Sequence, residues 1–340
     1  MGVRHRPMRP EDVAECAEIV AANPVIGPRY GRAIADLPHA WLRLLDCEAM
    51  RTNVFRMGNG FHAPICFVGV SLFVSDDFVR ELKAPPGVWI GPELVKRILH
   101  RTSPILSDTQ LREANSLGGL NLVVWEGCAR SGFETNNEVY RHVMNTFIEE
   151  HKGFLLKEVI GPQLESVERF LWTIESGGLL WNMEAGRYEK SYKMNPKEII
   201  RKPHFVGVVR EMESERSKLC AGSWIGALFD YHPPQIGFSR GEQRLLLAAL
   251  LGKTDAELAD DLGTSISTVK NTWRSIYNRL ASCQPEIFLD PSHTDAQHSD
   301  RGREKRRQLL AYLHQHPEEL RPVSQKLLRH ATSQPRRRSA

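Results

Sequence analysis

The chain has 340 residues, a formal net charge of +4, 41% hydrophobic residues and 25% charged residues. This composition is ordinary for a globular protein and excludes a fully disordered or collagen-like chain. No apolar run approaches the roughly 20 residues that a membrane-spanning helix needs, and no apolar segment follows the arginines of the first ten residues. We therefore expect a cytoplasmic protein with no membrane partner, and the length predicts about two domains. The scattered cysteines, without a CxxC pair, favour reduced thiols.

The first elements predicted along the chain are a strand and two helices. Residues 3–9 have the pattern of a strand. A helix is expected to open at Pro10 and to end at Asn23, because proline suits the first helical turn and the residue before a proline avoids helical backbone. A second helical stretch is expected around residues 40–50.

A hairpin follows, with strands at residues 53–57 and 65–74 around the pair Asn59-Gly60, which favours a tight turn. The second of these strands is rich in Val, Phe and Ile and is expected to be buried. A helix is predicted over residues 137–151, and further strands at 119–125, 154–160, 187–192 and 205–209. Mixed strands and helices predict one α+β domain over residues 1–230.

The charge is distributed unevenly. Residues 232–340 contain 17 Lys and Arg against 12 Asp and Glu, a net charge of +5, whereas the preceding part has a net charge of −1. From Arg301 onward the net charge is +8. A basic carboxy-terminal part indicates an anionic partner, with nucleic acid the first candidate, although a solubilising tail would explain the charge equally well.

Residues 231–237 contain two prolines and a glycine and are expected to form a linker. Beyond it the pattern predicts helices alone. Ser239 followed by Glu242 fits a capping box at the start of a first helix, which Gly252 ends. We therefore expect a second, all-α domain after the α+β domain.

Two further helices are predicted in this second domain. Thr254 with Glu257 fits another capping box, Gly263 supplies a turn, and Thr264 or Ser265 caps the third helix. One face of the third helix is apolar and is expected to pack on a core: Ile266, Val269, Trp273, Ile276, Tyr277 and Leu280. The opposite face carries short polar side chains and cations without a carboxylate: Ser267, Thr268, Lys270, Asn271, Arg274 and Asn278.

Residues 238–280 resemble the LuxR/FixJ-type DNA-binding domain without a gap. The positions that match are Glu242, Gly252, Glu257-Leu258-Ala259, Leu262-Gly263, Ser265, Thr268-Val269-Lys270, Ile276 and Leu280. The resemblance implies a helix-turn-helix domain over residues 238–282, which binds double-stranded DNA as a homodimer with its third helix in the major groove. It also implies that Lys270, Asn271 and Arg274 face the DNA. Thr272 departs from the histidine usual in the family.

Each polar side chain of the third helix suits a particular contact with DNA. Thr268 and Lys270 are placed to hold phosphates, whereas Asn271 pairs well with adenine and Arg274 with guanine. The predicted DNA-binding residues are Ser267, Thr268, Lys270, Asn271, Arg274 and Asn278.

Residues 283–340 are expected to form a basic, partly helical extension with a helix over 302–315. In this family a short dimerisation helix directly follows the third helix, but here a loop-like stretch intervenes. The helix at 302–315 is consistent with a displaced dimerisation element, an added DNA-contacting arm, or a cover for the core of its own domain.

The amino-terminal domain offers no comparable motif. Its opening, Met8 to Asp12, and its hairpin resemble the start of GNAT acetyltransferases. The Arg/Gln-x-x-Gly-x-Gly/Ala loop that binds the pyrophosphate of CoA in that family is not found in place. We expect no catalytic residues, no metal and no cofactor, and interpret Cys128 as a structural thiol. Six tryptophans either pack in the core or line a small-molecule pocket: Trp41, Trp89, Trp125, Trp172, Trp181 and Trp224.

The sequence thus predicts a bacterial-type transcriptional regulator rather than an enzyme. Its amino-terminal domain would sense a small-molecule ligand or mediate association, and its carboxy-terminal domain would bind DNA. An alternative is a GNAT-like acyltransferase with an appended DNA-targeting module. A third interpretation is an adaptor whose helical domain binds protein.

Overall fold

A computed structural model describes residues 2–58, 63–100, 103–190, 195–210, 224–288 and 300–322. The chain divides into two compact units, one ending at Asp230 and one beginning at Tyr231. None of the described helices combines the length and the apolar character that crossing a bilayer requires.

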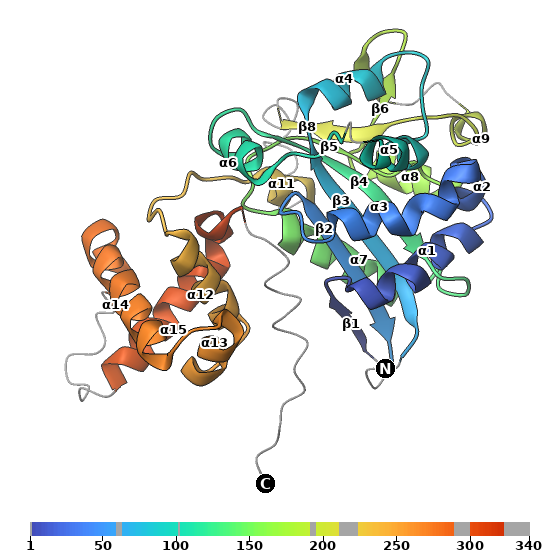
Figure 1. Cartoon of the computed structure of the whole chain (residues 1–340). Helices are drawn as coiled ribbons and strands as arrows, with labels where there is room; N and C mark the ends of the chain where they lie inside the picture. The colour runs from blue at the N-terminus through green and yellow to red at the C-terminus, as the bar shows by residue number, and fades with distance from the viewer. Residues whose placement is uncertain are drawn as a thin grey trace. The chain divides into compact units, whose positions relative to one another are not determined.

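The strands of the first unit form one eight-stranded sheet in the order β1-β2-β3-β4-β5-β8-β6-β7 (Figure 1). Their bounds are β1 Val3–Arg6, β2 Met50–Met57, β3 Ile65–Val74, β4 Leu120–Ala129, β5 Leu156–Ile160, β6 Leu179–Asn182, β7 Arg187–Glu189 and β8 Val206–Val209. Neighbouring strands are antiparallel except β4 and β5, which are parallel. The parallel pairing ends at Val123, and the rest of β4 pairs with β3 alone.

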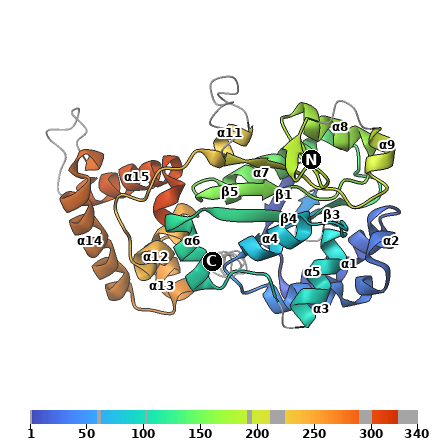
Figure 2. The ribbon, with the colours of Figure 1, turned by 90° about the horizontal axis from the view of Figure 1, so that it is seen from above.

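Helices cover both faces of this sheet. Their bounds are α1 Val13–Ala22, α2 Ile26–Tyr30, α3 Leu37–Leu44, α4 Asp76–Lys83, α5 Ile90–Leu99, α6 Asp108–Leu117, α7 Asn137–His151, α8 Val167–Glu175, α9 Pro196–Ile199 and α11 Trp224–Phe229, with 3-10 turns η1 Pro10–Asp12 and η2 Gly31–Asp36. Figure 2 shows α1, α3, α4 and α5 on one side of the sheet and α7 and α11 on the other. Each side has its own buried apolar core.

The central strand β3 explains why two cores form. Its sequence is a nearly continuous run of apolar residues, and its side chains are buried on both faces. Val68, Val70 and Leu72 pack in the core beside α1 and α3, whereas Phe67 and Phe73 face the α7 side. The expectation of a buried strand here is confirmed.

The mixed helix and strand content of the amino-terminal region is as predicted, but one helix was misplaced. The stretch 40–50 is not one helix, because α3 covers Leu37–Leu44 and Met50 already begins β2. Pro38 lies in the first turn of α3, and the chain turns at Cys47, whose N–H bonds to the carbonyl of Leu44 at 2.8 Å. The predicted Asn59-Gly60 turn lies outside the described residues.

The described part of the second unit contains helices and 3-10 turns without a strand: α12 Arg240–Leu250, α13 Asp255–Leu262, α14 Ile266–Cys283, η3 Pro285–Phe288, α15 Asp300–Gln315 and η4 Pro317–Leu320. Both predicted capping boxes are present. The Ser239 hydroxyl accepts the Glu242 N–H, and the Glu242 carboxylate accepts the Ser239 N–H at 2.8 Å. Gly263 ends α13 with a φ of +61°, the left-handed conformation that glycine adopts at least cost.

The core of the second unit extends beyond α12, α13 and α14. Leu309 and Leu313 of α15 and Leu320 of η4 are buried in the same cluster as Leu246 and Val269. Of the three interpretations left open for the helix after residue 300, a cover for the core is therefore the one that the packing matches.

The end of the predicted linker also belongs to this core. Ile236 is 3% exposed, and the carboxylate of Glu319 accepts the N–H groups of Gln235 and Ile236 at 2.8 and 3.1 Å. Proline and glycine content alone did not reveal that η4 holds this segment.

Candidate functional site

The six predicted DNA-binding residues lie on the exposed side of α14. Ser267, Thr268, Lys270, Asn271, Arg274 and Asn278 are all exposed. Val269, Trp273, Ile276 and Leu280, on the opposite side, are buried. No carboxylate stands among the exposed residues, so a polyanion can approach this side of the helix without repulsion from it.

Ile266 differs from its predicted place in the core, because its side chain is 47% exposed. It is the first residue of α14, so it precedes the turn in which Val269 meets the core. Helical periodicity places Ile266 on the apolar face but does not say where along the helix the core begins.

The first turn of α14 is held by its N-cap. The Ser265 hydroxyl accepts the Thr268 N–H at 3.1 Å and lies 2.7 Å from the Ser267 hydroxyl. Of the two predicted capping residues, Ser265 is therefore the one used. The N-terminus of a helix favours a nearby anion, because its first N–H groups have no partner within the helix.

Two of the predicted base readers contact each other. Arg274 Nη1 donates to Asn271 Oδ1 at 2.9 Å, one turn apart on the same helix. This bond restricts both side chains, so less rotamer entropy remains to be lost on binding.

A buried carboxylate fixes α14 against α12. Glu242 is 4% exposed, accepts the Ser275 hydroxyl at 2.9 Å and pairs with Arg279 at 3.3 Å. Burial by itself would raise the pKa of Glu242, but the hydrogen bonds from Ser239 and Ser275 outweigh it and lower the pKa. The orientation of α14 therefore depends on an ionised residue outside it.

Arg306 of α15 performs a similar task at the start of α13. Its guanidinium lies 4.6 Å from the Trp273 ring centroid, pairs with Asp255 at 2.9 Å and donates to the Lys253 carbonyl at 2.7 Å. The sequence did not predict this contact, since Arg306 stands 51 residues from Asp255 and belongs to a basic run that looks solvated.

The first unit contains a buried acid that the sequence did not single out. Glu126 of β4 is 5% exposed and accepts the hydroxyl of Tyr30, which in turn accepts Trp125 Nε1 at 3.0 Å. Burial raises the pKa of Glu126 to about 8. Glu126 lies in the part of β4 that has no β5 partner. Tyr30 and Glu126 are 96 residues apart, so no local motif joins them.

The loop between β4 and α7 lies where parallel strand and helix units often bind phosphate. Here two of its groups bond within the chain. The Gly132 N–H donates to the Glu134 carboxylate at 2.7 Å, and the Arg130 guanidinium is paired with Glu15.

The tryptophans have different environments. Trp41 and Trp125 are core residues in edge contact, whereas Trp172 is 52% exposed. Trp89 is half-buried and lines a surface pocket. Cys128 is buried, and its pKa is raised to about 12, largely by burial, so its thiol stays protonated and poorly reactive.

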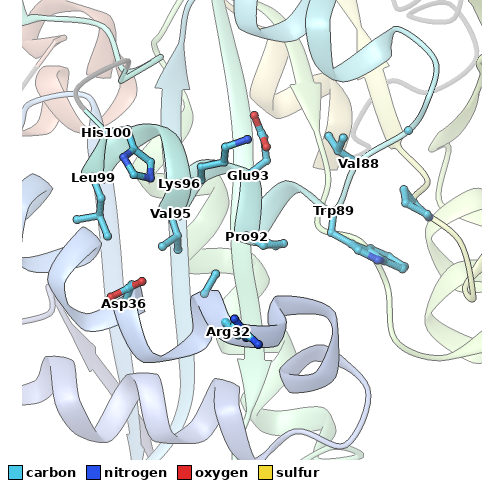
Figure 3. A pocket seen from close by; sticks show the side chains of 13 residues that line it. Arg32, Asp36, Val88, Trp89, Pro92, Glu93, Val95, Lys96, Leu99 and His100 are labelled. Carbon is cyan, nitrogen blue, oxygen red and sulfur yellow. The ribbon is translucent and has the colours of Figure 1, made fainter.

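The pocket lies between η2 and α5 and has a volume of about 570 Å³ (Figure 3). Its apolar lining consists of Ala33, Val88, Trp89, Pro92, Val95, Leu99 and Pro203. Its ionisable side chains are Arg32, Asp36, Glu93, Lys96 and His100. The volume is within the usual range for small-molecule sites. The described residues contain no cluster of three or more metal-ligating side chains.

Comparisons with known proteins assign no family. No protein-family profile and no curated protein matches the chain. Among solved structures, the histone acetyltransferase HPA2 and related acetyltransferase from Corynebacterium glutamicum is similar at 10% identity with a TM-score of 0.35. The match covers 61% of this chain and 95% of that one. A superposition of that quality does not establish a shared fold.

Proposed function

We propose that the chain is a sequence-specific DNA-binding regulator whose recognition helix is α14. The observation that carries the proposal is the set of six polar and cationic side chains exposed on one side of a helix whose other side is buried. A helix preceded by a tight turn and a shorter helix has the arrangement of a helix-turn-helix motif. The resemblance of residues 238–280 to LuxR/FixJ-type domains supports the same function.

Within this proposal the side chains have distinct roles. Lys270 and the hydroxyls of Ser267 and Thr268 contact phosphates and fix the position of the helix on the duplex. Arg274 reads guanine, and Asn271 both supports Arg274 and presents its free amide group to a neighbouring base. Because one helix reads only a few base pairs, we propose that two copies of the chain bind adjacent half-sites.

The decisive experiment measures binding of the full chain to genomic DNA fragments by fluorescence anisotropy over a series of salt concentrations. Lys270→Ala is expected to weaken binding to all sequences and to lower the log–log salt slope by about one. Arg274→Ala is expected to cost about 1–3 kcal/mol and to relax preference at one base position.

A matched control is Arg244→Ala, which removes an exposed cation from α12 of the same unit. It is expected to leave the sequence preference unchanged. Absence of DNA binding at low salt, or unchanged binding by the Lys270→Ala, Arg274→Ala double variant, would refute the proposal and favour the adaptor interpretation.

The alternative of an acyltransferase has one observation in its favour. Glu126 is a buried carboxyl hydrogen-bonded to Tyr30, on the stretch of β4 that lies beyond its pairing with β5. A carboxyl whose pKa is near neutrality is suited to act as a general base. Against it stand the missing Arg/Gln-x-x-Gly-x-Gly/Ala pattern and the Gly132 N–H after β4, which donates to Glu134 instead of a ligand.

Acetyl-CoA distinguishes these functions. Under the regulator proposal, calorimetric titration of the full chain detects no acetyl-CoA binding. Under the acyltransferase alternative, acetyl-CoA binds, and transfer to an amine rises with pH toward about 8 as Glu126 ionises and is lost in Glu126→Gln.

A further inference from the structure

The pocket between η2 and α5 has an aromatic wall that is held in place from several directions. The Gln163 amide accepts the Ile90 N–H at 2.6 Å and donates to the Val88 carbonyl at 3.0 Å. One side chain therefore fixes the backbone on both sides of Trp89. The Arg29 guanidinium lies 4.3 Å from the Trp89 ring centroid.

Arg29 is itself fixed by the backbone. It donates to the carbonyls of Gln163, Leu164 and Ile200, the last two at 2.9 Å. With its guanidinium anchored, Arg29 supports Trp89 as a rigid platform. A preformed aromatic surface loses little conformational entropy when a ligand binds against it.

The charges around the pocket favour a negatively charged ligand. Arg32 of η2 and Lys96 of α5 are exposed, line the pocket, and have no ion-pair partner among the described residues. Glu93 also lines it, but its carboxylate pairs with Arg97 at 2.7 Å. Among the described residues that line the pocket, the side chains without an ion-pair partner are thus two cations, Arg32 and Lys96, and one acid, Asp36.

The ionisable side chains are spread along both walls of the pocket. Figure 3 shows Asp36 and His100 at the end away from Trp89. Between that end and Trp89 it shows Arg32 of η2 on one side of the pocket and Lys96 with Glu93 of α5 on the other. An anionic group near Arg32 would leave the rest of a flat ligand to cover Trp89 and the apolar lining.

We propose that this pocket binds a small organic anion with a flat apolar body, of the aromatic carboxylate class. The carboxylate pairs with Arg32, since a guanidinium matches a carboxylate in geometry as well as in charge, and Lys96 adds a second positive charge from the other wall of the pocket. The ring packs on Trp89 and the aliphatic lining. This site belongs to the first unit and does not depend on DNA binding, so its test is separate from that of the proposed function.

Calorimetric titration of the full chain with three probes tests the ligand class. 2-Naphthoate provides a charge and a flat ring, 2-naphthamide lacks the charge, and acetate lacks the ring. We expect 2-naphthoate to bind at least about tenfold more tightly than either of the other two, a difference of about 1.4 kcal/mol. Equal binding of 2-naphthoate and 2-naphthamide, or no binding of 2-naphthoate at millimolar concentration, overturns the proposal.

Substitutions test the location. The Arg32→Gln, Lys96→Gln double variant is expected to weaken 2-naphthoate about tenfold and to leave 2-naphthamide unchanged. Asp36→Asn is expected to tighten 2-naphthoate, because it removes a negative charge from the same pocket. Arg141→Gln, which removes an exposed cation from α7, is the matched control. All these side chains are exposed, so their loss does not threaten folding. Unchanged 2-naphthoate binding in the double variant refutes the site.

Discussion

His204 in the first unit is a buried histidine whose hydrogen bonds and burial keep its ring neutral. It is 5% exposed, its Nδ1 bonds to the Lys202 carbonyl at 3.0 Å, and its Nε2 accepts the Leu164 N–H at 3.2 Å. Both contacts require the neutral ring with its proton on Nδ1. Burial, aided by the charge of Arg29, lowers the pKa of His204 to about 4.

The sign of the resulting pH dependence follows from this shift. The unfolded chain binds a proton at His204 near pH 6.5, whereas the folded chain does so only near pH 4. The stabilising contribution is therefore present above pH 6.5 and is lost as the pH falls toward 4. Between pH 7 and pH 5, the free energy of unfolding of the unsubstituted chain should fall because of His204. We expect this fall to be smaller by about 2 kcal/mol in His204→Gln.

Urea unfolding followed by tryptophan fluorescence at several pH values measures this difference. His39→Gln, at an exposed histidine, provides the control and should unfold with the pH dependence of the unsubstituted chain. If the unfolding free energy of His204→Gln varies with pH as that of the unsubstituted chain does, His204 does not contribute to the pH dependence.

At the scale of elements, the sequence predicted what local signals encode. A capping box is a signal of only four residues that predicts the start of a helix. The structure has both predicted boxes, Ser239 with Glu242 and Thr254 with Glu257. Strand β3 was evident from its unbroken apolar run. The polar side of α14 was evident because helical spacing alone separates exposed from buried residues.

Contacts between distant elements could not be predicted in this way. Glu126 meets Tyr30, and Arg306 meets Asp255, only because the fold brings their elements together. The pocket likewise depends on two segments, η2 and α5, that carried no motif. Ile266 was misplaced because periodicity records the side of a helix and not the extent of the core beside it.

The two capping boxes of the helical unit differ in a way that a pair of substitutions can reveal. Glu257 is exposed and accepts bonds from its own N-cap residue, Thr254. Glu242 makes the equivalent bond and in addition binds Ser275 and Arg279 of α14. We expect Glu257→Ala to cost about 1 kcal/mol, the typical value of a cap, and Glu242→Ala about 1–2 kcal/mol more.

Thermal unfolding of both variants provides the measurement. Glu242→Ala is also expected to reduce DNA affinity, because α14 loses a support from outside the helix, whereas Glu257→Ala is not. Equal loss of stability in the two variants would mean that the contacts between α12 and α14 contribute nothing.

At the scale of the whole molecule, the chain contains two units, each with its own buried clusters. The second unit is larger than the three helices α12, α13 and α14, since α15 and η4 complete its core. The basic segment after residue 300 thus contributes Leu309, Leu313 and Leu320 to the core, while its exposed cations face solvent.

The contribution of α15 to this core can be measured with two leucines of the same unit. Leu309 is fully buried, whereas Leu251 is 48% exposed. Leu309→Ala removes apolar volume from a closed core and is expected to cost about 2–5 kcal/mol, against less than about 1 kcal/mol for Leu251→Ala. Calorimetry of the full chain should show the transition of the helical unit lowered in the first variant alone. We also predict that a chain ending at residue 299 loses both the unfolding transition of the helical unit and its DNA binding. If α15 were a dispensable arm, this shortened chain would keep both, and Leu309→Ala would be as stable as Leu251→Ala.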